Sequence, residues 1–126
     1  MLKKIANFKY SYDFKKIMSS KVDNQNRFIS TVFHALADPI RLEIIFFLRE
    51  GEKCVCEIVP HLNLIQPLVS RHLKILKDSG IVRCRKDGTK RMYSIVDVRI
   101  YTVVDALTPE LVNTLRKEVF ESITYR

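Results

Sequence analysis

Two cysteines one residue apart, Cys54 and Cys56, are the side chains of this sequence best suited to chemistry. Soft thiolates select soft metal ions, so a thiolate pair is a good start on a site for such an ion. Packing as small apolar residues and reversible thiol oxidation are the other roles open to the pair. Residues two apart on an ideal helix point about 200° away from each other. We therefore expect one ion to take both sulfurs only by distorting the helical turn that carries them.

The third cysteine, Cys84, alternates with Val82 on the side of a β-like run that we expect to be buried. We interpret it as a small core residue rather than a ligand. Three cysteines are an odd number, and a chain of 126 residues is long enough to have its own core. This cysteine usage does not suggest a disulfide framework, and a reducing compartment would keep the cysteines as thiols.

Positive charge is concentrated in one part of the chain. The net charge is +8, and residues 71–93 hold eight lysines and arginines against two aspartates, which is a net +6. A scattered solvated surface is the ordinary interpretation of a basic protein, whereas such a concentration is the footprint expected of a phosphate-binding face. Nucleic acid is therefore the partner that the charge pattern favours.

A helix expected over residues 66–79 has two different faces. Val69, Leu73 and Leu76 lie within about 60° of one another on a helical wheel, so this side is expected to pack. The opposite side carries Ser70, Arg71, Lys74 and Lys77. In a DNA major groove, arginine can pair with guanine and lysines can meet phosphates. The alternative is the solvated side of an amphipathic helix, and the basic segment that follows favours DNA.

The elements that must position these residues can be placed from periodicity and from capping signals. Asp38 and Pro39 are typical of a helix start, and Asp87-Gly88 is typical of a tight hairpin. Thr108 and Pro109 indicate a break with a new helix start. The expected elements are helices over 12–19, 24–36, 39–48, 53–61, 66–79 and 100–123, the last with that break, and β-runs over 81–86 and 90–96.

Four segments together resemble the ArsR/SmtB family of winged-helix, metal- and metalloid-responsive transcriptional repressors. They read ALADPIRLEIIFFL, CVCEI, QPLVSRHLKILKDSGIV and RKDGTKRMYSI, and they match in order and spacing over about residues 30–96. The resemblance implies a mainly α fold with a small β-hairpin, a winged helix-turn-helix dimerised through its N- and C-terminal helices. It also implies one domain over 1–126, comprising an N-terminal extension (1–23), a winged-helix core (24–98) and C-terminal dimerisation helices (99–126).

The same resemblance implies a homodimer on an inverted-repeat operator in double-stranded DNA, with the helix after residue 65 in the major groove and the wing along the backbone. The implied DNA-binding residues are Gln66, Ser70, Arg71, His72, Lys74, Lys86, Lys90 and Arg91. Gln66 stands in the first turn, from which recognition helices mainly read bases. His72 lies on the flank of the packing face, so a structural role is equally open to it. Ile65 departs from the family's usual serine or threonine and cannot cap the helix.

In the resembled family, a Cys-x-Cys at the place of Cys54 and Cys56 binds arsenite, antimonite or soft divalent metals and releases DNA. The resemblance thus implies that an inducer binds this pair and that the protein requires no resident cofactor. The family's other metal site, on the last helix, needs histidine and acidic ligands. The three histidines, His34, His61 and His72, all lie outside that helix, so we do not expect a zinc site there.

Other classes of protein are poorly supported. The chain has only three glycines and lacks a phosphate loop, a nucleophile elbow and a zinc-hydrolase signature, so we do not expect an enzyme. Its longest uncharged run, residues 58–70, is too short for a membrane span of about 20 residues. The N-terminus lacks the apolar core of a secretory signal, so we expect a cytoplasmic protein. A protein-interaction module with an incidental basic segment is the remaining alternative.

Overall fold

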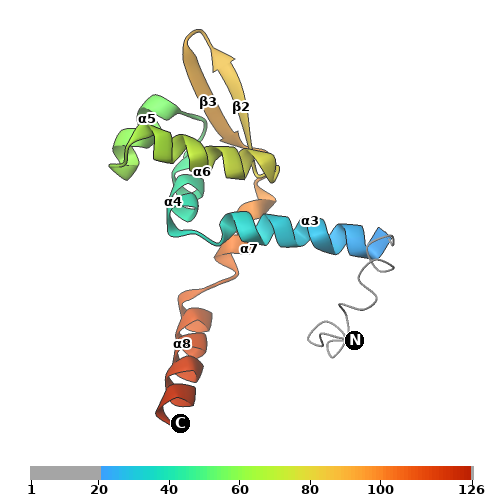
Figure 1. Cartoon of the computed structure of the whole chain (residues 1–126). Coiled ribbons are helices and arrows are strands. Elements are labelled where there is room, and N and C mark those ends of the chain that lie inside the picture. Colours follow the sequence, from blue (N-terminus) through green and yellow to red (C-terminus); the bar gives the residue numbers. More distant parts are fainter. Residues whose placement is uncertain (1–20, 126) are drawn as a thin grey trace.

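The computed structural model describes residues 21–125, and its side chains are described from Asn24. The helix expected over 12–19 lies outside the described residues. Figure 1 shows the elements in chain order: α3 (Lys21–Leu36), α4 (Pro39–Leu48), β1 (Lys53–Cys54), α5 (Val55–Leu62), α6 (Gln66–Asp78), β2 (Val82–Asp87), β3 (Lys90–Ile95), α7 (Arg99–Asp105) and α8 (Pro109–Thr124). This is the winged helix-turn-helix that the sequence predicted, mainly helical with a small antiparallel sheet.

The start of α4 shows why the chain turns sharply between the first two described helices. The side chain of Asp38 accepts hydrogen bonds from the backbone N–H groups of Ile40 at 2.8 Å and Arg41 at 3.2 Å. Pro39 occupies the first helical position, where its missing N–H costs nothing. The predicted cap is therefore confirmed, and it fixes the point at which α4 leaves α3.

The helix-turn-helix is made of α5 and α6, which are joined by a short turn. Asn63 ends α5 in the left-handed conformation, with φ of 53°, and α6 begins three residues later. The helix expected over 53–61 differs at its start. Residues 53–54 pair instead with β3 as strand β1, so that α5 begins only at Val55.

The wing is the hairpin of β2 and β3, which pair from Val82 opposite Ile95 to Asp87 opposite Lys90. Gly88 stands first in the two-residue loop with φ of 62°, which is the conformation that such a turn asks of glycine. The sheet order is β1-β3-β2, so β3 is the central strand. The predicted hairpin is confirmed, and β1 is an addition that the sequence did not indicate.

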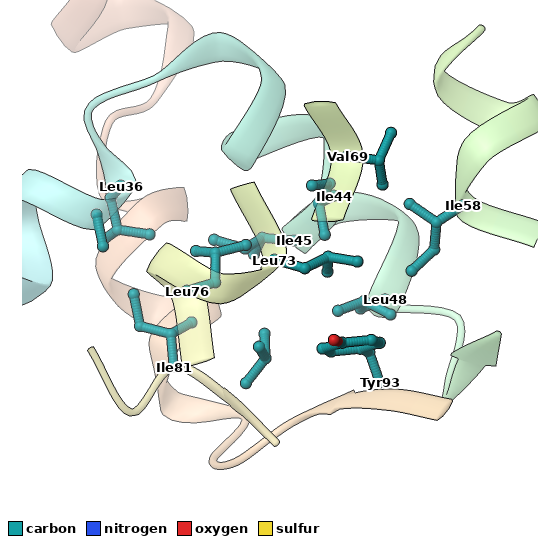
Figure 2. Close-up of a cluster of buried hydrophobic side chains, with 12 residues drawn as sticks. Leu36, Ile44, Ile45, Leu48, Ile58, Val69, Leu73, Leu76, Ile81 and Tyr93 are labelled. Carbon is teal, nitrogen blue, oxygen red and sulfur yellow. The ribbon is translucent and has the colours of Figure 1, made fainter. Parts of the chain in front are cut away.

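The core lies where α4, α5, α6 and the hairpin meet (Figure 2). Val69, Leu73 and Leu76 of α6 are fully buried, as the helical wheel predicted. They pack with the fully buried Ile44 and Ile45 of α4. Burying an aliphatic side chain of this size contributes about 1.5–3 kcal/mol. This packing fixes the rotation of α6 about its axis and thereby decides which residues of α6 face outward.

The C-terminal segment breaks where the sequence predicted. After α7, the side chain of Thr108 accepts a hydrogen bond from the backbone N–H of Leu111 at 3.3 Å, and Pro109 opens α8. Figure 1 shows α8 reaching away from the helix-turn-helix and the wing. None of its described residues is buried, so its apolar side chains find no core within this copy of the chain.

Candidate nucleic-acid interface

The outward face of α6 carries four of the eight predicted DNA-binding residues. Gln66, Ser70, Arg71 and Lys74 are exposed on it, together with Lys77. Ile65 precedes the helix in an extended conformation and makes no capping hydrogen bond, so the expectation that it cannot cap is confirmed. Lys74 is held by Asp78 at 2.8 Å on the surface. An exposed pair of this kind is worth at most about 1 kcal/mol, so Lys74 can exchange its partner for a phosphate.

His72 lies on the other side of α6 and is only 8% exposed. A guanidinium can only donate hydrogen bonds, so Nδ1 of His72 accepts from a terminal nitrogen of Arg41 at 3.1 Å. This burial favours the structural role that the sequence left open to His72 over the predicted contact with DNA. The physical reason is the rotation of α6 about its axis: burial of Leu73 in the core turns the adjacent imidazole of His72 inward as well.

Arg41 is the centre of a buried polar network behind α6. It is 7% exposed, and its Nε donates to the carbonyl oxygen of Ala35 at 2.6 Å, while a terminal nitrogen donates to that of His34 at 3.3 Å. Its guanidinium also lies 4.0 Å from the Asp38 carboxylate. The network joins the end of α3, the cap of α4 and, through His72, α6.

The Asp38 carboxylate is stabilised in its charged form by this arrangement. Partial burial acts to raise its pKa, but hydrogen bonds from the backbone N–H groups of Arg41 and Ile40 and the charge of Arg41 outweigh that effect. The net result is a pKa below the usual value. Asp38 therefore remains charged and continues to cap α4 at neutral pH.

Two cations of the wing, Lys90 and Arg91, line a groove together with residues of α6. Lys86, Lys90 and Arg91 are exposed. The base of the wing is held by Arg85 of β2, whose Nε donates to the carboxylate of Glu52 at 2.9 Å. That hydrogen bond and the charge of Arg85 lower the pKa of Glu52. Arg85 is therefore engaged within the chain, whereas the three cations nearer the tip are available to a polyanion.

A groove of about 870 Å³ lies between α6 and the wing. One wall carries Ser70 and Lys74 of α6, and another carries Lys90 and Arg91 of β3. The start of α5 closes it, and the residues there include both Cys54 and Cys56. The structure thus brings the cysteine pair into one groove with five of the eight predicted DNA-binding residues, which are Gln66, Ser70, Lys74, Lys90 and Arg91.

The cysteine pair does not have the geometry expected from an ideal helix. Cys54 lies in β1 and precedes α5, and its Cα lies 5.0 Å from that of Cys56, with the two sulfurs joined as a disulfide. The expectation that the sulfurs point about 200° apart is therefore wrong, because only one of the two residues is helical. Sγ of Cys54 accepts a hydrogen bond from the Cys56 N–H at 2.9 Å and so caps α5. The two sulfurs are therefore close enough to share one ligand.

Cys84 is separated from this pair by the central strand. It lies opposite Tyr93 in the sheet, whereas Cys54 lies opposite the adjacent residue, Met92. Successive residues of a strand face opposite sides, so Cys84 and Cys54 point to opposite faces of the sheet. Burial and a hydrogen bond with Cys84 raise the pKa of Tyr93. Over residues 21–125, no group of three or more His, Cys, Asp or Glu side chains is placed to hold a metal ion.

The polar contacts of two arginines, Arg41 and Arg49, were not predicted from the sequence. The buried network of Arg41 had one visible signal, a lone arginine in the apolar run PIRLEIIFFL. The second contact is a forked pair of hydrogen bonds, 3.0 and 2.7 Å long, from Arg49 at the end of α4 to Asp105 of α7. Arg49 and Asp105 are 56 residues apart in sequence, and no local sequence pattern indicates that they pair.

Within the part of the chain that the structure describes, no helix has the length and apolarity needed to cross a membrane.

The family model described as "Bacterial regulatory protein, arsR family" matches residues 38–83. This segment runs from the cap of α4 through the helix-turn-helix into the first strand of the wing.

Individual proteins agree with the family model. An uncharacterized HTH-type transcriptional regulator of Methanocaldococcus jannaschii is 50% identical over 55% of this chain and 79% of its own length. The arsenical resistance operon repressor of Staphylococcus xylosus is 43% identical over 53% of this chain and 64% of its own length. The homodimeric winged helix-turn-helix DNA-binding domain of Mb0332 from Mycobacterium bovis superposes with a TM-score of 0.68 at 28% identity, covering 73% of this chain and 88% of that domain. The chain therefore belongs to the ArsR/SmtB family of DNA-binding transcriptional regulators.

Proposed function

We propose that this chain binds an inverted-repeat operator as a homodimer, represses transcription there, and leaves the operator when a soft metal or metalloid such as arsenite or antimonite binds Cys54 and Cys56. The observation that carries the proposal is the shared groove, in which the cysteine pair adjoins the cations of α6 and the wing. A relative that is 43% identical is an arsenical resistance operon repressor, which supports the choice of ligand.

On DNA, α6 enters the major groove with its N-terminal half, where Gln66, Ser70 and Arg71 reach base edges and phosphates. Gln66 can pair with adenine and Arg71 with guanine. The wing lies along the adjacent backbone, where Lys86, Lys90 and Arg91 meet phosphates. Lys74 adds a further phosphate contact from α6.

The homodimer forms through the apolar side chains that one copy leaves exposed on its first and last helices. These are Phe28, Ile29 and Phe33 of α3, Val103 and Leu107 in and after α7, and Leu111, Leu115, Val119, Phe120 and Ile123 of α8. Large apolar side chains exposed in this number on the terminal helices are typical of a surface that a protein partner covers. Two-fold symmetry of the protein then matches an operator whose half-sites are inverted repeats.

Ligand binding is coupled to DNA release through the start of α5. Sγ of Cys54 caps this helix, so a ligand that takes its lone pair removes the cap and alters the first element of the helix-turn-helix. A typical coupling between two sites is about 1–3 kcal/mol, or roughly 5–150-fold in affinity. That range is sufficient to empty an operator that is occupied near its dissociation constant.

Thiol oxidation is the second candidate signal, and the disulfide between Cys54 and Cys56 in the structure favours it specifically. Oxidation joins the same two sulfurs in the same groove, directly before α5. The two signals differ in what they require: oxidation needs an oxidant and is reversed by a reductant, whereas metalloid binding needs reduced thiols.

The test is a titration of the purified chain against a duplex from its own upstream region, with the thiols kept reduced by a phosphine. We expect tight binding that weakens steeply with added salt and is released by arsenite. The double variant Cys54→Ser/Cys56→Ser should bind DNA normally and ignore arsenite, and Cys84→Ser is the matched control that should respond like the parent. Unchanged release from the double variant would refute the inducer site, and binding insensitive to salt would refute the DNA interface.

A further inference from the structure

We propose that the Cys54–Cys56 site prefers a monosubstituted trivalent arsenical, R–As(OH)2, over inorganic arsenite, As(OH)3. The inference rests on the proposed function and narrows its ligand class. It follows from three features of the protein: the number of soft donors in the chain, the position of Cys84, and the open groove beside the pair.

The chain offers few donors for a third bond. It contains three cysteines and three histidines, and all six lie in the described part. His72 is buried against Arg41, and the ring of His61 is stacked on Phe47 with centroids 3.8 Å apart. His34 lies on α3, which contributes no residue to the groove. No histidine therefore joins the cysteine pair.

Cys84 cannot complete the site within one copy of the chain. It belongs to β2, and the pair begins in β1, with the whole of β3 between them. Two strand spacings amount to roughly 9.5 Å, several times the length of a metal–sulfur bond of about 2.3 Å. Cys84 also faces the opposite side of the sheet from Cys54. Within one copy of the chain, the site is thus limited to two thiolates.

Two thiolates match the valence of a monosubstituted arsenical. Arsenic in R–As(OH)2 keeps its As–C bond and has two hydroxyls to exchange. Two S–As bonds form, two As–OH bonds break, and each hydroxyl leaves as water with a thiol proton; no atom changes oxidation state. Arsenite has three exchangeable hydroxyls, and two thiols can replace only two of them. Arsenite bound to this pair therefore keeps one hydroxyl and lacks a third As–S bond.

The groove supplies room for the substituent. Val55, Val59 and Pro60 line it next to the pair, and Cys56 is exposed to it. Its volume of about 870 Å³ exceeds that of a methyl or phenyl group. A carbon substituent on arsenic can therefore lie against apolar side chains while both sulfurs remain bound, and burial of apolar surface adds to its affinity.

The experiment compares phenylarsine oxide, which hydrates to the dihydroxide, with arsenite by titration calorimetry on the phosphine-reduced full chain. We expect one phenylarsine oxide per chain, bound at least about tenfold more tightly than arsenite. The count of free thiols should fall from three to one. Cys84→Ser should bind like the parent, and Cys56→Ser should lose at least about tenfold in affinity.

Three results would overturn the inference: arsenite binding as tightly as phenylarsine oxide, a loss of affinity in Cys84→Ser, or no binding of either arsenical. Release of labelled DNA is scored in the same samples and tests the proposed function separately. Arsenite that binds equally and releases DNA refutes the ligand preference but supports the repressor. If phenylarsine oxide binds preferentially but does not release DNA, the ligand preference is supported and the proposed induction mechanism is refuted.

Discussion

Replacing Arg41 by methionine should test whether the buried network holds the recognition helix in place. Methionine fills most of the same volume but removes the charge and every donor. The guanidinium donates to the carbonyl oxygen of Ala35 at 2.6 Å and to Nδ1 of His72 at 3.1 Å. Both acceptors are largely buried and would lose their donor. The variant therefore removes the link between α4 and α6 while disturbing the packing little.

The expected cost can be worked from these contacts. A hydrogen bond from a charged group contributes about 1.5–3 kcal/mol, and breaking a buried charge network typically costs about 3–5 kcal/mol. We expect Arg41→Met to lower the free energy of unfolding by about 3–4 kcal/mol. A domain is usually stable by only about 5–15 kcal/mol, so the variant should fold but denature at clearly lower urea concentration. DNA affinity should fall as well, because the position of α6 is less well defined.

Arg49→Met is the matched control. Arg49 makes two hydrogen bonds to Asp105, but the two side chains are 45% and 53% exposed. Its guanidinium also lies 4.3 Å from the centre of the Tyr101 ring. An exposed pair with a cation–π contact contributes little to stability, so Arg49→Met should lower the free energy of unfolding much less than Arg41→Met does. Both variants are compared by urea unfolding at one protein concentration, since a dimer's stability depends on it. Equal losses in the two variants would refute the argument from burial.

Three further predictions concern single positions. Ile65→Ser supplies the missing cap of α6 and should raise the free energy of unfolding by about 1 kcal/mol in urea titration; no gain would mean that the helix start needs no cap. The folded state lowers the pKa of Asp38, so the charged carboxylate stabilises the fold at pH values above the unfolded-state pKa of 3.8. This stabilisation is lost as the pH falls through the lower pKa of the folded state. Asp38→Asn should therefore flatten the acid side of the stability profile, and an unchanged slope there would contradict the assignment. Lys90→Ala should weaken DNA binding for all sequences and reduce the salt slope by about 1; an unchanged slope would remove Lys90 from the phosphate contacts.

Local patterns in the sequence were sufficient for most of the fold. The periodicity of Val69, Leu73 and Leu76 predicted the packing face of α6, and Asp87-Gly88 predicted the hairpin. The caps at Asp38 and Thr108 were also found where expected. These signals succeed because they act over a few residues, where backbone hydrogen bonding and side-chain direction are fixed by the element itself.

The candidate site was less accessible to sequence reasoning. Cys54 was expected on a helix, but pairing of β1 with β3, some 38 residues away in sequence, removes it from α5 and places its sulfur beside that of Cys56. A two-residue strand has no periodicity of its own to indicate such pairing. His72 shows the same limit, because a flank position on a wheel can turn either way until the core is assembled.

The sequence by itself determined the helices, the hairpin, the concentration of positive charge and the presence of a cysteine pair, since each depends on residues close together in the chain. Tertiary structure alone decided that the pair opens onto the groove between α6 and the wing, that Cys84 is kept apart from it, and that Arg41 and His72 form a buried contact. The physical reason is that these relations depend on how elements distant in sequence pack, and packing depends on the volume and polarity of the whole core.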